Sequence, residues 1–378
     1  MAKSKARRSK TGQKLQAETS IPWQRKLIYS MIVGLGFFGF LELGLRVLDF
    51  GRPPVLGHLR FGYETGIPVF DSDGIETEGQ VYQDMPLFEA DSELFWRPIA
   101  NTPFTGPLGY RKPEPMLPGS DGDLKILVLG DSCSFLGREP YPSRIGPKIE
   151  ETSKRPCKVV NASCPGYSSK QGTIKLQQCL AIKPDLVIVY FGWNDHWKSL
   201  NGCTDAELVE RRDAIQKLQS NLSSFRLYWM FQSLFSREKA PANLSDSPVR
   251  VPLEDFQLNL TEIQESCEKI GARVIFVTAP TGFQQSMPEW APGFFGQYYH
   301  MTPQQVARIP QTHAEYNQAI RDLFQGKPNC SVVDLEANMK NETGLYRSDQ
   351  IHLSEAGHQR AAELISAEVT RAIGQPKQ

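Results

Sequence analysis

The sequence predicts an α/β fold in which helices cover both faces of a parallel sheet. Near-continuous apolar runs of five to seven residues recur from position 124 onward, and longer segments with helical character separate them. Strands that are apolar throughout are buried on both faces, and the helices between them supply the crossovers that parallel strands need. The chain is also long enough to carry further segments before this domain.

Five strands and six helices are expected in the domain. The strands are expected at 124–130, 157–161, 185–191, 273–279 and 331–335. The helices are expected at 143–153, 170–182, 205–219, 254–270, 303–325 and 354–373. Two aromatic-rich stretches, 220–250 and 281–300, are predicted as loops that form part of a substrate cleft or lid, pack over the domain edge, or rest on a membrane surface.

A basic tail followed by an apolar stretch opens the chain. Residues 1–26 contain eight Lys or Arg residues and a single acid, Glu18. Residues 27–48 are mostly apolar, and Glu42 and Arg46 lie one helical turn apart, where they can pair. We predict a transmembrane signal anchor at 27–48, with the tail cytoplasmic and the rest of the chain periplasmic or extracellular. A cleaved secretory signal and a buried core helix are the alternatives; no small-residue cleavage motif follows, and a core helix does not explain the tail.

The region between the anchor and the α/β domain has a different composition. Residues 49–120 are rich in proline and glycine, with few periodic patterns. Their aromatic residues, Trp96 and Tyr110 among them, favour an irregular segment that covers the domain at 121–375 over a solvated stalk.

Overall composition narrows the function classes. Lys plus Arg and Asp plus Glu both number 42, so the formal net charge is zero and no nucleic-acid partner is predicted. The seven cysteines cannot all pair, and several fall in predicted strands or helices as small apolar fillers. Only Cys133 is expected to line a site. No Cys/His group has zinc-ligand spacing, so no metal is predicted.

A candidate nucleophile follows the first predicted strand. Gly130-Asp131-Ser132 comes directly after the run 124–129, and open α/β sheets place reactive groups beyond the carboxyl ends of their strands. A nucleophilic serine needs a histidine base and a carboxylate that orients it. Asp349 and His352 supply both within one predicted loop, where the carboxylate can reach Nδ1 and leave Nε2 facing the serine.

Two further loops provide candidate hydrogen-bond donors. Asn194 follows the strand at 185–191, and its side-chain N–H can stabilise a developing oxyanion. Gly166 follows the strand at 157–161 and can bring its backbone N–H close to the same oxygen. Each loop alone is more often an ordinary turn. Three such loops at the carboxyl ends of strands indicate a shared site.

The four blocks GDSCSF, NASCPGY, GWND and DQIHLS occur in the order of the SGNH (GDSL) hydrolase family, which the chain resembles, including its bacterial membrane-anchored members. The resemblance implies a three-layer α/β/α sandwich with a five-stranded, flavodoxin-like sheet of order 2-1-3-4-5. It implies Ser132 as nucleophile, His352 as base and Asp349 as the orienting acid. It also implies an oxyanion hole from the Ser132 N–H, the Gly166 N–H and the Asn194 side chain, and no cofactor.

The implied function is that of a serine esterase that hydrolyses O-acetyl or other short acyl esters through an acyl-serine. The expected partner is an ester-bearing small molecule or an acylated glycan. One alternative is an O-acyltransferase that modifies cell-envelope or exported polysaccharide. Another is a non-catalytic carbohydrate-binding protein on the same scaffold, which the intact Ser132, Asn194, Asp349 and His352 disfavour.

Neighbouring residues are expected to have structural roles. Asp131 and Asp195 are predicted to bond the backbone of their turns. His196 lies two residues after Asn194 and could contact substrate. His358 is predicted on the surface of the terminal helix, which Ser354 would cap.

Overall fold

The computed structural model describes most of the α/β domain and part of the N-terminal region. The described residues are 22–50, 88–91, 93–117, 122–199, 202–210, 222, 224–235, 247–283, 289–299, 301–340, 342–347 and 349–374. The chain divides into two compact units, Met1–Arg52 with Phe225–Leu234, and Pro53–Ser224 with Phe235–Gln378. All the predicted site residues belong to the second unit.

A five-stranded parallel sheet forms the centre of the second unit. Its strands are β3 (Leu124–Gly130), β4 (Cys157–Asn161), β5 (Leu186–Tyr190), β6 (Arg273–Val277) and β7 (Cys330–Val333). They are hydrogen-bonded in the order β4-β3-β5-β6-β7, with every neighbouring pair parallel. In chain order this is the expected 2-1-3-4-5 arrangement, and the fold prediction is confirmed.

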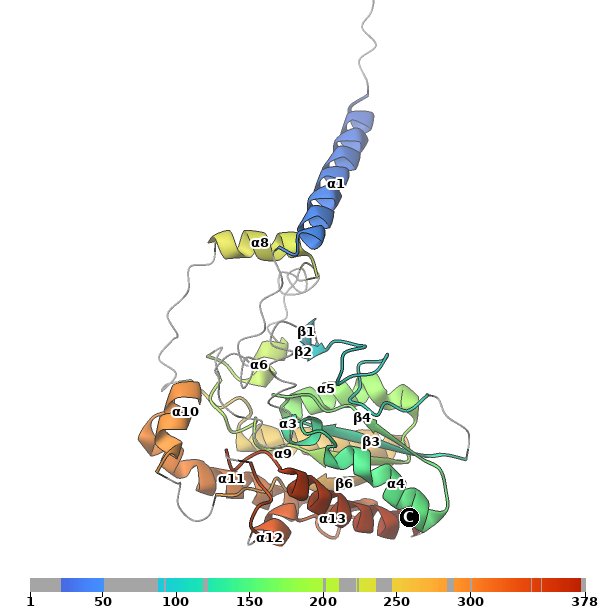
Figure 1. Cartoon of the computed structure of the whole chain (residues 1–378), viewed down its shortest axis with the longest axis vertical. Helices are drawn as coiled ribbons and strands as arrows, with labels where there is room; N and C mark the ends of the chain where they lie inside the picture. The colour runs from blue at the N-terminus through green and yellow to red at the C-terminus, as the bar shows by residue number, and fades with distance from the viewer. Residues whose placement is uncertain are drawn as a thin grey trace, which may run out of the picture. The chain divides into compact units, whose positions relative to one another are not determined.

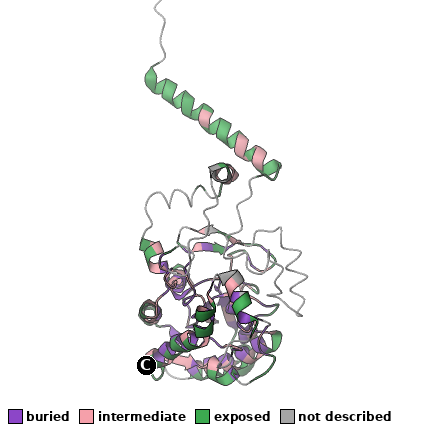
Figure 2. Ribbon diagram, turned by 90° about the vertical axis from the view of Figure 1, so that its left-hand side faces the viewer, coloured by how far each residue is buried: buried purple, intermediate pink, exposed green. Residues whose placement is uncertain are grey.

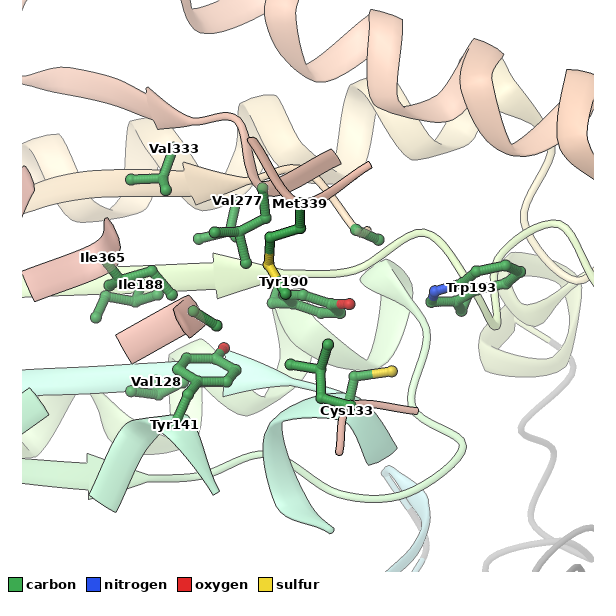
Figure 3. Close-up of a cluster of buried hydrophobic side chains, with 14 of the residues drawn as sticks. Val128, Cys133, Tyr141, Ile188, Tyr190, Trp193, Val277, Val333, Met339 and Ile365 are labelled. Carbon is green, nitrogen blue, oxygen red and sulfur yellow. The ribbon is translucent and has the colours of Figure 1, made fainter. Parts of the chain in front are cut away.

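Alternate side chains of the central strands enter two different cores. On one face, Ile126 and Val128 of β3 pack in a cluster with residues of α4 (Tyr141–Ser153) and α13 (Glu355–Gly374). Figure 3 shows this core around Val128, with side chains from both helices. On the other face, Leu127 and Leu129 pack in a cluster with residues of α5 (Ser169–Cys179), α9 (Leu253–Lys269) and α11 (Pro303–Phe324).

Burial of these strand residues is nearly complete. Each of the four side chains from β3 is at most 1% exposed. Removing an aliphatic side chain of this size from water stabilises the fold by roughly 1.5–3 kcal/mol. The helices on the two sides of the strands (Figure 1) therefore hold β3 firmly, and with it the turn that follows its carboxyl end.

Shorter helices lie in the connections, and some replace predicted loops. They are α3 (Ser132–Phe135), α6 (Asp205–Glu210), α10 (Ala291–Tyr299), α12 (Leu335–Met339) and the 3-10 turn η2 (Leu180–Ile182). The predicted loop at 281–300 contains α10, and the loop at 220–250 contains α8 (Arg226–Phe235), so both were wrong in these parts. The predicted helix at 205–219 begins as α6, and its remainder lies outside the described residues.

The described part of the proline-rich segment contains a small hairpin that was not predicted. Strand β1 (Phe88–Asp91) pairs antiparallel with β2 (Phe95–Pro98). The Asp91 carboxylate accepts hydrogen bonds from the backbone N–H groups of Glu93 and Leu94, which closes the turn. Leu94 and Trp96 are buried in the core beside α5. Residues 51–87 of the predicted covering segment lie outside the described residues.

The first unit contains a long apolar helix, α1 (Trp23–Val47), which covers nearly all of the span predicted at 27–48. Its 25 residues correspond to roughly 37 Å of helix, enough to cross a hydrocarbon core of about 30 Å. None of its residues is buried, and it is mostly exposed in Figure 2. The predicted pair forms, with Arg46 Nε 2.7 Å from Glu42 Oε1. By length and composition α1 can cross a membrane.

Candidate active site

The turn after β3 presents Ser132 at the first position of α3. The Asp131 carboxylate caps this short helix by accepting a hydrogen bond from the backbone N–H of Cys133, at 2.9 Å. A side chain at Gly130 would collide with the Ser134 hydroxyl, so the tight packing of strand against helix requires glycine there. Sheet packing and capping together fix the serine beyond the strand end.

His352 joins Ser132 to Asp349 in one hydrogen-bonded chain. Nε2 of the imidazole lies 2.8 Å from Ser132 Oγ, and Nδ1 lies 2.6 Å from Asp349 Oδ2. The other carboxylate oxygen accepts the backbone N–H groups of Ile351 and His352, each at 2.9 Å. Gln350 adopts a left-handed conformation (φ 59°) inside this turn. A serine hydroxyl bonded to such a pair can be activated by general-base catalysis.

The charge state of Asp349 follows from these contacts. Burial opposes its ionisation, but the nearby His352 and the hydrogen bonds from His352 and Ile351 outweigh burial and hold the pKa of Asp349 below its usual value. The carboxylate is therefore ionised at neutral pH. An anion at this position favours the imidazole tautomer that carries its proton on Nδ1 and leaves Nε2 free to accept one.

Asn194, in the turn after β5, lies beside the serine turn. Its Nδ2 donates to the Tyr167 carbonyl at 3.0 Å and contacts Asp131 Oδ2 at 3.3 Å. Asp131 is fully buried, and burial raises its pKa to about 7, although the Cys133 N–H and the charge of His352 oppose the shift. Ionised and neutral Asp131 thus coexist near neutral pH. The contact to Asn194 weakens when this carboxyl group is protonated.

The loop that contains Gly166 is hydrogen-bonded to the turn after β5 through the Tyr167 carbonyl and Asn194. Gly166 has a φ of +80°, and a Cβ there would lie 3.0 Å from the Trp96 ring. The Arg250 guanidinium donates to the Gly166 carbonyl at 2.7 Å and also pairs with Asp205 at 2.8 Å. In the described part of the chain, neither the Gly166 nor the Ser132 backbone N–H donates a hydrogen bond. Both donors are available to an oxygen of a bound substrate.

Arg250 and Trp96 support this loop, and neither was predicted. Trp96 Nε1 donates to the Pro165 carbonyl at 3.0 Å, and the Tyr167 hydroxyl donates to the Trp96 carbonyl at 2.8 Å. The Arg250 guanidinium carbon lies 5.8 Å from the centre of the Trp96 ring. Arg250 is the last residue of the loop predicted at 220–250, which carries no motif, so the sequence offered no signal for it. The pairing of Trp96 with NASCPGY is equally invisible in the sequence.

The neighbouring residues take the predicted roles only in part. Asp195 accepts the backbone N–H groups of Ser169 and Gly192, as expected for a turn-bonding residue. His196 is buried, and its Nε2 lies 3.2 Å from Nδ1 of the buried His313, so it packs in the interior beside Trp193. Cys133 is 1% exposed and belongs to the core in Figure 3, which corrects the expectation that it lines the site.

The surface position predicted for His358 is wrong. The side chain is 2% exposed, and its Nδ1 accepts the backbone N–H of Tyr141 at 3.3 Å. Burial is the largest of the effects that hold the pKa of His358 well below its usual value, and nearby cationic groups add to it. Ser354 does cap the helix, because its Oγ accepts the Gly357 N–H. In the described residues, no group of three or more His, Cys, Asp or Glu side chains could hold a metal ion.

Comparison with known proteins agrees with this architecture. The sequence model of the GDSL-like lipase/acylhydrolase family matches residues 128–360, more than half of the chain. No curated protein matches.

Solved structures that are similar to this chain include three from bacteria. A lipase/acylhydrolase from Enterococcus faecalis is 19% identical, with 67% of this chain and 98% of that chain covered and a TM-score of 0.42. A GDSL-like lipase from Bacteroides thetaiotaomicron is 12% identical (68% and 93% covered, TM-score 0.40). An acetylxylan esterase from Geobacillus stearothermophilus is 18% identical (69% and 98% covered, TM-score 0.38). The chain belongs to the GDSL-like lipase/acylhydrolase family, and it is an ester-hydrolysing enzyme.

Proposed function

We propose that this enzyme hydrolyses O-acetyl or other short acyl esters through an acyl-serine formed on Ser132. The observation that carries the proposal is the hydrogen-bonded chain from Ser132 Oγ through His352 to Asp349. His352 Nε2, 2.8 Å from the hydroxyl, takes its proton as Oγ attacks the ester carbonyl carbon. Asp349 holds the opposite N–H of the ring and stabilises the imidazolium that forms.

The electron pair displaced from the carbonyl moves onto its oxygen. We propose that the Ser132 N–H, the Gly166 N–H and the Asn194 amide receive this oxyanion, with the 3.3 Å contact between Asn194 Nδ2 and Asp131 giving way to it. Collapse of the tetrahedral intermediate breaks the bond to the alcohol oxygen, which takes the proton from His352 Nε2. A water molecule then attacks the acyl-serine by the same route and releases the acid. One donor in such a hole contributes about 3–4 kcal/mol of barrier reduction.

The test compares wild type with Ser132→Ala on p-nitrophenyl esters of increasing acyl length. We expect the highest kcat/KM on the acetate and a loss of several orders of magnitude in the variant. Wild type, but not Ser132→Ala, should react with a fluorophosphonate serine probe. Equal hydrolysis by both proteins would overturn the assignment of Ser132. Failure of wild type to react with the probe would favour a binding protein on this scaffold.

Transfer to a sugar hydroxyl uses the same acyl-serine, so the products must be measured. With an acetylated donor and an oligosaccharide acceptor present, hydrolysis predicts more free acetate than acetylated oligosaccharide. The reverse ratio would assign the enzyme to acyl transfer onto glycans. No described side chain favours water or a sugar hydroxyl as the acyl acceptor. We propose hydrolysis because the matching family is one of lipases and acylhydrolases.

We further propose that α1 anchors the enzyme in a membrane, with its basic N-terminal tail in the cytoplasm and the catalytic unit on the opposite face. The length and apolar composition of α1 support a span, and the charge of residues 1–26 supports the orientation. The full chain should remain in the membrane fraction after alkaline carbonate extraction. Protease added to intact spheroplasts should digest the catalytic unit. Release by carbonate, or protection from protease, would contradict the anchor or its orientation.

A further inference from the structure

Helix α8 is unusually apolar for a helix that leaves its side chains accessible. Its ten residues include seven apolar or aromatic ones, and its only charged residue is Arg226 at the start. Phe231 and Leu234 are 46% and 69% exposed. The helix is about 15 Å long, too short to span a bilayer, and helices of this length are marginal in water without a partner. Its stability therefore depends on its surroundings.

One partner is the C-terminal part of α1, which α8 meets in Figure 1. The two carboxylate oxygens of Glu42 accept the backbone N–H groups of Arg226 and Leu227, at 3.1 and 3.0 Å. A carboxylate of α1 thus caps the N-terminus of α8. Its negative charge also interacts favourably with the positive end of the α8 helix dipole. The same carboxylate also accepts a hydrogen bond from Arg46 Nε, so residues of both helices hold it in position.

Arg226 completes the junction in the opposite direction. Its guanidinium donates to the Asp49 carboxylate at 2.8 Å and contacts the carbonyl groups of Leu45 and Phe50 at 3.3 and 3.4 Å. These carbonyls belong to the end of α1 and the residues just beyond it; the Leu45 carbonyl also accepts a hydrogen bond from the Phe50 N–H. The start of α8 and the end of α1 satisfy each other's backbone groups, and their charges are paired.

The position of this junction determines what the apolar side chains meet. Glu42 comes directly after the uncharged, mostly apolar run 27–41 and about 7.5 Å before the end of α1. If α1 spans a bilayer, the junction lies where the helix leaves the hydrocarbon and enters the headgroup layer. Tyr228 and Trp229 are the residue types that concentrate at this depth. Leu227, Met230, Phe231 and Leu234 follow the i, i+3, i+4, i+7 spacing of one helix face.

We propose that α8 is an interfacial helix whose apolar face inserts into the lipid bilayer beside the exit of α1. The inference rests on the proposed membrane anchor. It adds a second membrane contact, contributed by a segment that lies between β5 and β6 in the chain. The chain therefore passes between the first unit and the catalytic unit at three points, after α1 and on either side of α8.

The test places an environment-sensitive probe on α8 in the full-length protein. Leu234→Cys is labelled with NBD and reconstituted into vesicles of phosphatidylethanolamine and phosphatidylglycerol. Leu258→Cys, on α9 of the catalytic unit, is the matched control because its leucine is 66% exposed, close to the 69% of Leu234. Six of the seven native cysteines are buried, and signal from the labelled parent protein is subtracted. Spin-labelled lipids that carry the nitroxide near the top of the acyl chain act as quencher.

We expect the Leu234 probe to emit at shorter wavelength than the Leu258 probe and to lose at least half of its fluorescence to the quencher. Glu42→Ala removes both hydrogen bonds to the N-terminus of α8 and should reduce this quenching by severalfold. Glu363→Ala, on α13 of the catalytic unit, should leave the quenching unchanged. A Leu234 probe that is quenched no more than the Leu258 probe would overturn the proposal. Carbonate extraction of the same samples separates the two ideas: protein that stays in the vesicles with an unquenched Leu234 probe refutes the interfacial helix alone.

Discussion

Replacing Asp349 by Asn tests how the structure fixes the histidine tautomer. Oδ1 of Asp349 accepts two backbone N–H groups, so in the variant the amide oxygen must occupy that position. The amide NH₂ then replaces Oδ2 and faces Nδ1 of His352, 2.6 Å away in the wild type. An NH₂ group can only donate there, which forces the imidazole proton onto Nε2. With Nε2 protonated, His352 cannot accept the proton of Ser132.

The expected loss is about 10³- to 10⁴-fold in kcat, equivalent to about 4–5.5 kcal/mol of barrier, with a much smaller change in KM. The hydroxyl, the oxyanion donors and the backbone hydrogen bonds all persist, so the variant should fold. Hydrolysis of p-nitrophenyl acetate gives the rates, with Ser132→Ala as the lower limit, and thermal unfolding checks the fold. A folded Asp349→Asn protein with kcat within tenfold of wild type would refute the tautomer argument.

Three further variants probe the surroundings of the serine. Asn194→Ala should lower kcat by about 10²- to 10³-fold with little change in KM, because it removes an oxyanion donor; an unchanged kcat on p-nitrophenyl acetate would exclude that role. Arg250→Met keeps the bulk beside Trp96 but removes the hydrogen bond to the Gly166 carbonyl, so kcat should fall by up to about 100-fold, and Arg250→Lys should restore part of it. Asp131→Asn should alter the pH dependence of stability. Folded Asp131 keeps its proton up to about pH 7, whereas the usual value is 3.8, so its contribution to the free energy of unfolding falls as pH rises between these values, by about 1.4 kcal/mol per pH unit. Denaturant unfolding of the variant should show a slope more favourable by that amount over this range, and parallel curves for the two proteins would contradict the assignment.

The sheet could be predicted because its strands are mostly apolar, and the central β5 is buried along its whole length. Continuous apolar runs bounded by turn residues located all five strands to within about two residues, and β3 lies at the predicted 124–130. The hairpin β1–β2 could not be predicted in this way. Its strands have only four residues each, and its stability comes from Leu94 and Trp96 packing on distant parts of the chain.

The spacing of apolar residues along α13 and α8 indicates features of these helices that were not predicted. His358, Ala361, Ala362 and Ile365 follow the spacing of one helix face, and all four are buried. That pattern places His358 on the apolar face of α13, in contrast to the predicted surface position. The same spacing runs through α8. This segment was predicted as a loop because its aromatic residues are typical of a substrate cleft or lid. Helix α10 differs, since its Pro292, Gly293 and Gly296 disfavour a helix and only its packing reveals it.

The two halves of the candidate site differ in how far a sequence can reveal them. Ser132 and Asn194 follow neighbouring parallel strands, so sheet topology alone brings their turns to one edge. His352 is not attached to a strand, and its position depends on a loop that folds back on itself. The Arg347 N–H donates to the His352 carbonyl at 2.8 Å, and the buried Arg347 guanidinium donates to the Leu353 carbonyl at 3.0 Å. The spacing of Asp and His identified the pair, but the arginine that bonds one side of their loop to the other has no motif. A short motif can therefore identify the reacting groups, whereas the groups that hold them in place are found only when the chain is folded.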